Sequence, residues 1–285
     1  METPDSYPEL IAQHMALFQE GSDIQVEQTE FRMRIAKSWD IKKGDRLLEV
    51  GCGQGDMTAV LADAVGPEGF IRAVDLAGPE YGFPVRLGDS LEVLKATPLG
   101  DRLDYSLNFD ILAPENTFPD DSFDAVVFAH CSWYYESLDV LKSHLIRVRP
   151  YAKLLYFSEW DLEPINMDQV PHLLAVLIQG QIGVFKPRSG NNARTLFTRT
   201  MLEELLSESG WSIVARRTID TSGLQNGKWE VSNCLTTSEK EAELLDVPVK
   251  YRQYIKTQTD LLTQMTGNGA CQSLSTYSIV AARQV

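Results

Sequence analysis

Residues 47–55 read LLEVGCGQG, a short apolar run that breaks into glycines at alternate positions. The apolar run predicts a buried strand, and the segment DMTAVLADAVG at 56–66 predicts a helix directly after it. Alternate glycines between a strand and a helix let the backbone approach a ligand without Cβ clashes. The stretch therefore predicts a strand–loop–helix unit that holds a nucleotide-like ligand at Gly51, Gly53 and Gly55.

Strands and helices alternate outward from this loop along much of the chain. Strands are expected at 46–51, 70–76, 102–108, 123–130, 152–160, 211–220 and 275–283, and helices at 56–66, 90–100 and 139–150. Alternation at this spacing indicates a parallel sheet with helices on both faces. The strands are apolar nearly throughout, which is typical of strands buried on both sides. The sequence thus predicts an α/β fold with a doubly wound, mostly parallel sheet.

Further helices are expected outside this alternation. Helices at 8–19 and 25–39 form an N-terminal segment, residues 1–40, which we expect to cap the main domain, residues 41–285, as a lid. Helical inserts are expected in that domain at about 162–197 and 236–268. The first insert contains a helix at 167–183 and a loop rich in glycine and asparagine at 186–194. A capping box of Thr200 and Glu203 predicts the start of a later helix.

The helix expected at 249–265 carries a continuous apolar stripe in the second insert. An apolar stripe at helical spacing indicates a face that packs on a core. The alternatives are a lid over the ligand and the contact face of a homodimer. The stripe consists of Tyr251, Tyr254, Ile255, Leu261, Leu262 and Met265.

The composition limits the classes of function. The 285 residues carry a net charge of −14, whereas gripping a nucleic-acid backbone usually needs a basic face, so we expect no nucleic-acid partner. No apolar run approaches the ~20 residues of a membrane span, so no membrane partner is expected. The start METPDSYPEL does not resemble a secretory signal. Four cysteines without C-x-x-C spacing argue against a metal site or a disulfide framework and favour a reducing, cytoplasmic location.

The residues around the glycine loop indicate which kind of ligand it holds. A dinucleotide-binding fingerprint needs G-x-G-x-x-G, but Asp56 stands where the third glycine would be. Glu49 and Asp56 would repel a pyrophosphate and attract a cationic ligand. Asp75, at the end of the second strand, can accept hydrogen bonds from both hydroxyls of a ribose. Together these features argue against a nicotinamide or flavin cofactor.

The pieces LLEVGCGQG, AVDL, NFDI and FPDDSFDAVVFAH, in this order, resemble the class I (Rossmann-like) S-adenosylmethionine-dependent methyltransferases. The resemblance spans roughly residues 40–160 and returns weakly in FTRTMLEELLSESGWSIVARR. It implies a seven-stranded sheet with an antiparallel last strand and S-adenosylmethionine as the cofactor. It also implies that the glycine loop lies along the methionine part, that Asp75 holds the ribose and that Asp110 holds the adenine. The cofactor-binding residues that it implies are Glu49, Gly51, Cys52, Gly53, Gly55, Asp75, Leu76, Asp110, Ile111 and Ala129.

Candidates for the chemistry come from the segments after the fourth and fifth strands, because ligands of open α/β sheets bind at the carboxyl ends of strands. Methyl transfer from a sulfonium is a direct displacement, so the protein aligns the acceptor and, where needed, removes a proton. His130 is the candidate general base, since imidazole titrates near neutral pH. The alternative is a histidine that shapes the cofactor pocket through local hydrogen bonds. Trp133, Tyr134 and Trp160 are candidate substrate contacts for a flat or cationic small molecule, or else core residues.

The expected function is methyl transfer from S-adenosylmethionine to an oxygen or nitrogen of a small-molecule acceptor, in specialised metabolism. The alternative is a protein that resembles this family and binds the cofactor without transferring its methyl, to promote a rearrangement or cyclisation or to act as a non-catalytic partner. An intact glycine loop and Asp75 are expected in both cases. The two differ in whether an acceptor atom can reach the sulfonium methyl in line.

Overall fold

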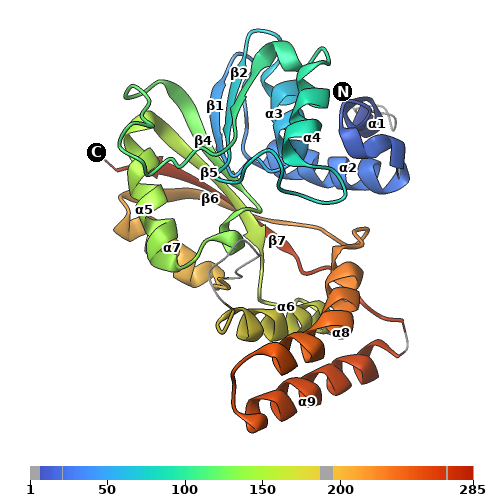
Figure 1. Ribbon diagram of the computed structural model, residues 1–285. Coiled ribbons are helices and arrows are strands. Elements are labelled where there is room, and N and C mark those ends of the chain that lie inside the picture. The colour runs from blue at the N-terminus through green and yellow to red at the C-terminus, as the bar shows by residue number, and fades with distance from the viewer. Residues whose placement is uncertain (1–6, 21, 187–194, 268, 285) are drawn as a thin grey trace.

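The computed structural model describes residues 7–20, 22–186, 195–267 and 269–284 and contains one seven-stranded sheet (Figure 1). The strand order is β3-β2-β1-β4-β5-β7-β6, and β7 runs antiparallel to both of its neighbours. This confirms the predicted α/β fold with a seven-stranded, mostly parallel sheet and an antiparallel last strand. The strands are β1 (Arg46–Val50), β2 (Phe70–Val74), β3 (Leu103–Ser106), β4 (Phe123–Ala129), β5 (Ala152–Trp160), β6 (Trp211–Ile219) and β7 (Thr276–Arg283).

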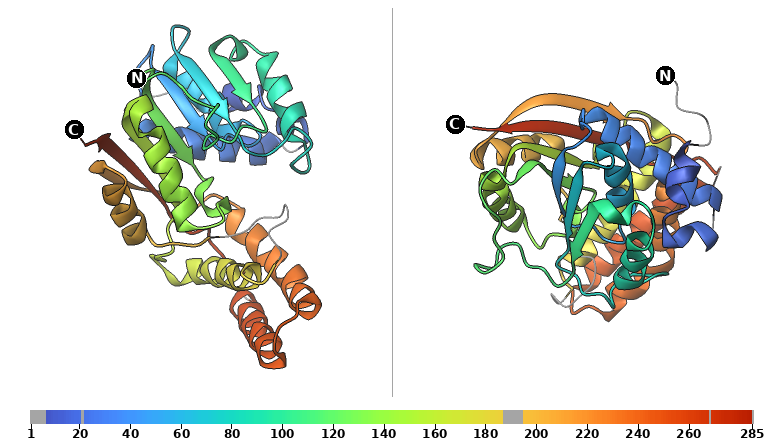
Figure 2. Two further views of the ribbon diagram at one scale, coloured as in Figure 1. Left: turned by 60° about the vertical axis from the view of Figure 1, so that its left-hand side comes forward. Right: turned by 90° about the horizontal axis from the view of Figure 1, so that it is seen from above.

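Helices cover both faces of the sheet, which is why its central strands are largely apolar (Figure 2). One face packs on α1 (Tyr7–Ala12), α2 (Ser22–Ser38), α3 (Asp56–Val65) and α4 (Leu87–Lys95). The other face packs on α5 (Leu138–Val148) and α7 (Arg199–Glu208). Leu47 and Leu48, neighbours on β1, are both fully buried, one in each of these cores. The alternation of side chains along the strand therefore divides a single apolar run between two cores.

The segment expected as an N-terminal cap consists of α1, a short 3₁₀ helix at Ala16–Glu20 and α2. The single helix predicted at 8–19 is therefore interrupted, whereas the helix predicted at 25–39 is present and starts slightly earlier. Phe31 and Ile35 of α2, and Trp39 just after it, form an apolar face that is buried, each at most 3 % exposed. The Trp39 ring stacks on Tyr156 of β5 with 5.4 Å between ring centroids. Burial of this face fixes α2 against the sheet.

A separate helical unit of α6 (Val170–Gly183), α8 (Asn226–Leu244) and α9 (Val249–Thr266) lies beyond the end of β5 (Figure 1). It has a core of its own, which includes Ile178, Cys234 and Leu262. Its helices come from two parts of the chain, between β5 and α7 and between β6 and β7. The helix α8 begins at Asn226, ahead of the expected insert boundary at residue 236. The expected boundary is too late because the polar sequence of α8 shows little apolar periodicity.

The apolar stripe predicted on the last helix is divided between two environments. Ile255 and Leu262 are fully buried against α6 and α8, and Tyr251 packs on the same core. Tyr254 and Leu261, in contrast, are 59 % and 48 % exposed. In the views of Figures 1 and 2, α9 lies at the end of the helical unit farthest from the sheet. The buried residues of the stripe therefore pack on a core, as expected. A homodimer contact through the exposed residues stays a prediction.

Buried hydrogen bonds join the three chain segments that connect the helical unit to the sheet. Gln169 Nε2 donates to the carbonyl of Ser273 at 2.9 Å, and Thr221 Oγ1 donates to the carbonyl of Leu274 at 2.8 Å. Ser273 Oγ donates to the carbonyl of Leu224 at 3.0 Å. Because these polar groups are removed from water, their bonds hold three chain segments in one arrangement.

The remaining helix predictions need one correction. The side chain that caps α7 is Thr198, whose Oγ1 accepts a hydrogen bond from the amide of Met201, so the predicted cap at Thr200 is wrong. Glu203 does not complete a capping box, because its carboxylate pairs with Arg216 of β6. Most of the loop predicted at 186–194 lies outside the described residues. Other short 3₁₀ helices occur at Gly100–Arg102, Ser132–Tyr134, Arg149–Tyr151 and Met167–Gln169.

Candidate functional site

The glycine loop between β1 and α3 has three glycines in the left-handed region, with φ of 79° at Gly51, 54° at Gly53 and 86° at Gly55. A Cβ on Gly51 would lie 2.6 Å from Cys131 Cβ, and a Cβ on Gly55 would lie 2.8 Å from Leu91. A Cβ on Gly53 would meet no atom within 4 Å. The two outer glycines thus allow tight packing within the protein, while the middle one faces open space. The middle of the loop can therefore receive a ligand at its backbone.

Asp75, directly after β2, holds this loop in place. Its Oδ2 accepts a hydrogen bond from the amide of Gly53 at 2.8 Å, and its Oδ1 accepts one from the amide of Ala77 at 2.8 Å. Burial raises the pKa of Asp75 above its ordinary value, although these two amides oppose the shift. Each carboxylate oxygen can accept more than one hydrogen bond, so the side chain retains capacity for ribose hydroxyls.

Glu49 lies beneath the loop on β1 and is only 1 % exposed. It accepts a hydrogen bond from Thr58 Oγ1 at 2.6 Å. Burial raises the pKa of Glu49 to about 8, and the neighbouring acids Asp75 and Asp56 act in the same direction. Near neutral pH the carboxyl is therefore mostly protonated, and a cation bound nearby would favour its ionised form.

The charge of Asp56 is engaged within the protein, which the sequence alone did not indicate. Arg32 Nη2 of α2 lies 3.1 Å from Asp56 Oδ2, and Gln25 Nε2 donates to Asp56 Oδ1 at 3.2 Å. Asp56 thus connects the N-terminal cap to the first turn of α3. The acidic character of the loop therefore rests on Asp75, and on Glu49 once a bound cation favours its ionised form, rather than on Asp56.

The other residues implied by the resemblance lie along the same edge of the sheet. Asp110 is exposed, and its Oδ1 accepts a hydrogen bond from the amide of Leu112. Ile111 is 2 % exposed, whereas Leu76 is 68 % exposed next to Asp75. Cys52 is buried within the loop, and Ala129 is partly buried at the end of β4. Their contact with a cofactor stays a prediction. An open glycine backbone, acceptors for hydroxyls and acids suited to a cation nevertheless fit S-adenosylmethionine.

His130 follows β4 in a left-handed conformation with φ of 51°, an uncommon backbone for a residue with a side chain. The next residue, Cys131, packs on Gly51, so the turn that carries His130 lies next to the glycine loop. Its Nδ1 is 3.3 Å from Glu159 Oε1, and its Nε2 is 3.3 Å from Thr276 Oγ1. The side chain of His130 is 20 % exposed. The ring is thus held from two sides while part of it still reaches the surface.

Glu159, near the end of β5, is the charged group in the site that the sequence did not single out. Its side chain is 2 % exposed. Its Oε2 accepts hydrogen bonds from Ser132 Oγ at 2.7 Å and from the amides of Ser132 and Trp133 at 3.1 and 3.4 Å. Burial alone would raise the pKa of Glu159, but His130, Ser132 and the Trp160 amide outweigh it and lower the pKa below its usual value. The carboxylate is therefore ionised despite its burial.

Aromatic rings enclose the imidazole of His130. The Trp160 and Phe31 centroids lie 4.8 and 5.5 Å from the imidazole centroid, both edge-on. Phe31 and Trp160 stack on each other at 5.8 Å, and His172 of α6 contacts the Trp160 ring at 5.6 Å. The site therefore includes side chains from the cap, the sheet and the helical unit.

The remaining substrate candidates lie in different environments. Trp133 is 2 % exposed within the core beneath α5, whereas Tyr134 is 52 % exposed. Of the three aromatic candidates, the structure brings only Trp160 into ring contact with His130. Contact of any of the three with a substrate stays a prediction.

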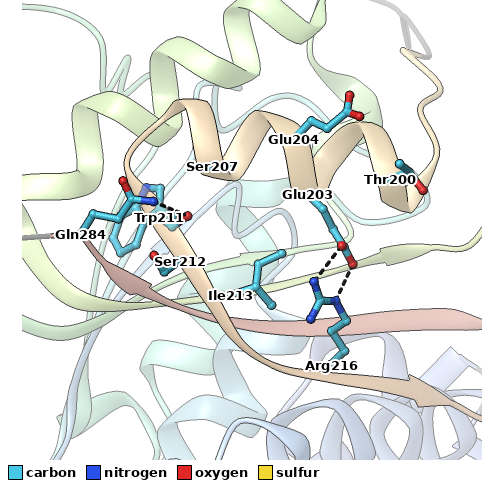
Figure 3. A pocket seen from close by; sticks show the side chains of 9 residues that line it. All are labelled: Thr200, Glu203, Glu204, Ser207, Trp211, Ser212, Ile213, Arg216 and Gln284. Atoms are coloured by element: carbon cyan, nitrogen blue, oxygen red, sulfur yellow. Dashed lines mark hydrogen bonds and ion pairs between the residues drawn. The ribbon is translucent and has the colours of Figure 1, made fainter.

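A hollow between α7 and β6 is separate from this site (Figure 3). It includes Trp211 at the start of β6 and Gln284 just after β7, which places it toward the amino-terminal edge of the parallel strands. Its charged side chains are largely paired, because Arg216 contacts Glu203 with both Nε and Nη2, at 2.7 and 2.8 Å. The glycine loop, Asp75, His130 and Glu159 all lie at or near carboxyl ends of strands, the usual ligand-binding edge of such sheets.

The described residues contain no group of three histidine, cysteine or acidic side chains placed to hold a metal ion. No helix in the described part of the chain is long and apolar enough to cross a membrane.

Comparison with known proteins places the chain among proteins of related fold. Residues 7–78 match the family model of protein-L-isoaspartate(D-aspartate) O-methyltransferase (PCMT). The chain is similar to a cyclopropane-fatty-acyl-phospholipid synthase-like protein from Lactobacillus casei ATCC 334, whose crystal structure is known. The two are 33 % identical and superpose with a TM-score of 0.85 over 98 % of this chain and 99 % of that one.

Two other relatives share less of the chain or less sequence. Demethylmenaquinone methyltransferase from Staphylococcus aureus (strain JH9) is 33 % identical over 96 residues. That match spans 34 % of this chain and only 35 % of the relative. Magnesium protoporphyrin IX methyltransferase from Synechocystis PCC 6803, solved with bound SAH, has a TM-score of 0.50 at 13 % identity, covering 92 % of this chain and 86 % of that one. This last likeness concerns the fold alone.

Proposed function

Because the chain belongs to the class I S-adenosylmethionine-dependent methyltransferase family, we propose that it transfers a methyl group from S-adenosylmethionine to an oxygen or nitrogen of a small-molecule acceptor. The observation that carries this proposal is the position of His130 on the turn after β4, whose next residue, Cys131, packs against the glycine loop. The bound cofactor supplies a methyl group that its sulfonium makes electrophilic. All four cysteines are free, which supports a cytoplasmic location.

Different residues at the carboxyl edge of the sheet bind the cofactor and remove the proton of the acceptor. The backbone at Gly53 receives the methionine part of the cofactor, and Asp75 accepts hydrogen bonds from the ribose. Glu49 and Asp75 together favour the positive charge. His130 takes the proton that a hydroxyl or amine nitrogen loses when it becomes methylated, and a positioned base of this kind contributes typically 10²–10⁴-fold to the rate. Trp160 and Phe31 exclude water from one side of the ring.

The acceptor is proposed to carry an O–H or N–H group because the site contains a base with a partly exposed ring. The names of two relatives suggest other acceptors, an acyl phospholipid and demethylmenaquinone. A panel of acceptors should therefore include hydroxylated aromatics, amines, an unsaturated phospholipid and demethylmenaquinone. Radiolabel from methyl-labelled S-adenosylmethionine is expected in the hydroxylated or amine compounds. Transfer only to the phospholipid or the quinone would contradict the choice of oxygen or nitrogen.

The role of His130 is tested by His130→Gln, which removes the base and keeps a polar side chain of similar reach. We expect turnover to fall about 10²-fold or more, with the calorimetric affinity for S-adenosylmethionine little changed. The matched control is His144→Gln, since His144 lies on α5 and its Nδ1 bonds within that helix to the carbonyl of Val140. Loss of cofactor binding in His130→Gln, without a separate loss of turnover, would show that His130 shapes the cofactor pocket instead.

A further inference from the structure

The environment of Glu159 is unusual for a carboxylate that only stabilises the fold. The side chain is 2 % exposed, and burial of a charge is costly even when it is paired. Well-packed apolar residues replace such groups at little or no loss of stability in many proteins. A buried and ionised carboxylate beside a partly exposed histidine therefore points to a role in the chemistry of that histidine.

Donors on one side of Glu159 fix the carboxylate in space. Its Oε2 accepts bonds from the hydroxyl and amide of Ser132 and from the Trp133 amide, all in the 3₁₀ turn after β4. Its Oε1 accepts the Trp160 amide at 3.0 Å. The same Oε1 lies 3.3 Å from His130 Nδ1. Oε2 thus accepts only from the turn after β4, while Oε1, besides accepting the Trp160 amide, faces the imidazole.

The nitrogen that faces Glu159 has no better partner. His130 Nδ1 is buried and makes no hydrogen bond to any described residue. A buried N–H without an acceptor costs free energy, so the carboxylate 3.3 Å away favours the tautomer with the proton on Nδ1. Hydrogen bonds of catalytic groups are often long without substrate and tighten in the complex. Glu159 thus selects Nδ1 as the protonated nitrogen.

The opposite nitrogen then becomes the base. With the proton on Nδ1, Nε2 carries a lone pair, and the Thr276 hydroxyl at 3.3 Å can donate to it. Thr276 is itself fully buried, whereas the imidazole is partly exposed. Nε2 is therefore the atom to which the O–H or N–H of an acceptor donates its proton.

We propose that Glu159 is the positioning residue of His130, holding the proton on Nδ1 so that Nε2 serves as the base. This inference rests on the proposed function and deepens it. When Nε2 takes the proton of the acceptor, the imidazole becomes positively charged. The buried carboxylate then stabilises that charge at close range, as a buried acid does in other acid–histidine pairs.

The other titratable groups around the pair do not perform this task. Cys131 follows His130, and burial, together with Glu159, raises the pKa of its thiol well above the usual value. Tyr277 of β7 pairs in register with Glu159, and burial raises its pKa too. Asp161 is separated from the pair by Trp160 in the chain and pairs with Arg199 at 3.7 Å. From α2 and α6 the ring contacts are Phe31, on His130, and His172, on Trp160.

The tautomer of His130 can be measured without any acceptor by ¹⁵N NMR of the histidine side chains in the full chain. The spectrum of wild type should show protonated Nδ1 and unprotonated Nε2, with His130→Gln used to assign the signal. Glu159→Gln keeps the size of the side chain and removes its charge. In this variant we expect a substantial fraction of the ring to move to the Nε2–H tautomer. An unchanged tautomer would overturn the proposal.

Kinetics provide the second readout, with the acceptor that the panel identifies. Glu159→Gln should lower kcat about 10²-fold or more, because a wrong tautomer removes the base. The KM for S-adenosylmethionine should change less than about threefold, since Glu159 does not contact the cofactor site directly. Glu203→Gln is the matched control, because it also removes one carboxylate charge but acts at the distant α7–β6 hollow (Figure 3). It should leave tautomer and kcat unchanged.

The two readouts separate this inference from the proposed function. Absence of methyl transfer in wild type, together with a tautomer change in Glu159→Gln, would remove the function and leave the positioning role. Methyl transfer in wild type with equal kcat in Glu159→Gln would remove the positioning role alone. If Glu159→Gln does not fold, Glu159→Asp decides the matter. It keeps the charge at a longer distance, so the proposal requires the Nδ1–H tautomer and an intermediate kcat, and a wild-type kcat would contradict it.

Discussion

Asp75 Oδ2 accepts a hydrogen bond from the amide of Gly53 at 2.8 Å, so the carboxylate after β2 also sets the conformation of the glycine loop on β1. Removal of this side chain should therefore affect the loop and the ribose site together. Asp75→Ala should weaken S-adenosylmethionine binding by roughly 1–3 kcal/mol, the cost of losing a hydrogen-bonded charge. Calorimetric titration measures this change. Unchanged affinity would contradict the ribose assignment.

A control for that experiment is available at the end of the next strand. Asp110→Ala also removes a carboxylate implied at the cofactor, but Asp110 is exposed, and its Oδ1 accepts a hydrogen bond from the nearby amide of Leu112. Because exposed groups contribute less, the loss of affinity should be smaller than for Asp75→Ala. Equal losses would mean that net charge, and not the geometry of Asp75, sets the affinity.

The glycine loop allows stability and ligand binding to be separated by two matched substitutions. Gly51→Ala places a Cβ 2.6 Å from Cys131 Cβ at a φ of 79°, so both a clash and a strained backbone oppose folding. Gly53→Ala meets open space and bears only the backbone cost, about 1–2 kcal/mol. We expect urea unfolding to show the larger loss for Gly51→Ala.

Binding should show the opposite order in whichever variants remain folded. The Cβ of Gly53→Ala occupies the space that a ligand would use, so its affinity for S-adenosylmethionine should fall more than its stability. A Gly53→Ala protein that binds the cofactor as tightly as wild type would mean that the ligand does not approach the middle of the loop.

Glu49 should make the free energy of unfolding depend on pH in an uncommon direction for a carboxyl group. Its pKa is about 8 in the fold, above the ordinary 4.5 of the unfolded chain. Below about 4.5 both states are protonated, and between about 4.5 and 8 only the unfolded state ionises. Stability therefore decreases as pH rises through this window, by at most about 1.4 kcal/mol per pH unit. Above the folded pKa the loss is complete and the contribution becomes constant.

The measurement is the difference in unfolding free energy between wild type and Glu49→Gln at several pH values from 5 to 8, determined without cofactor. Gln cannot ionise, so the variant should gain stability relative to wild type as pH rises, while other titrating groups cancel in the difference. A difference that does not vary with pH would show that Glu49 is already ionised in the fold.

The ion pair of Arg32 with Asp56 should contribute more than a surface pair, because both side chains are largely covered, at 23 % and 20 % exposed. A double-mutant cycle of Arg32→Gln and Asp56→Asn should give a coupling of about 1 kcal/mol, near the upper end for partly exposed pairs. The reference is the cycle of Arg216→Gln and Glu203→Gln, where Arg216 is 53 % exposed. A smaller coupling for Arg32–Asp56 than for the reference would contradict a role in holding the cap.

Much of the sheet could be predicted because its central strands are largely apolar runs buried on both faces. The strand β1 is the simplest case, since Leu47 and Leu48 face opposite cores and both must be apolar. The glycine loop was predictable for a local reason too, because Gly51, Gly53 and Gly55 are needed at positive φ. In contrast, α8 has a polar sequence that packs on α6, so its burial depends on a partner distant in the chain.

The parts of the site that escaped prediction depend on contacts between distant segments. Glu159 was visible as an acid near the end of the fifth strand, but its donors come from the turn at Ser132, and Thr276 reaches His130 from β7. These contacts follow only once the strand order places β4, β5 and β7 side by side. The pairing of Arg32 with Asp56 needs α2 to lie across the start of α3. Neither relationship leaves a spacing pattern in the sequence.

The strand order also has a consequence for how this protein is made. The strand β7 comes last in the sequence, yet it lies between β5 and β6 and hydrogen-bonds to both. While the ribosome is still translating α8 and α9, β5 and β6 each have an edge without its final neighbour, and Thr276 has not reached His130. Such edges attract other chains. The nascent polypeptide is therefore most exposed to aggregation just before its last strand emerges, and the candidate active site is completed only at that moment.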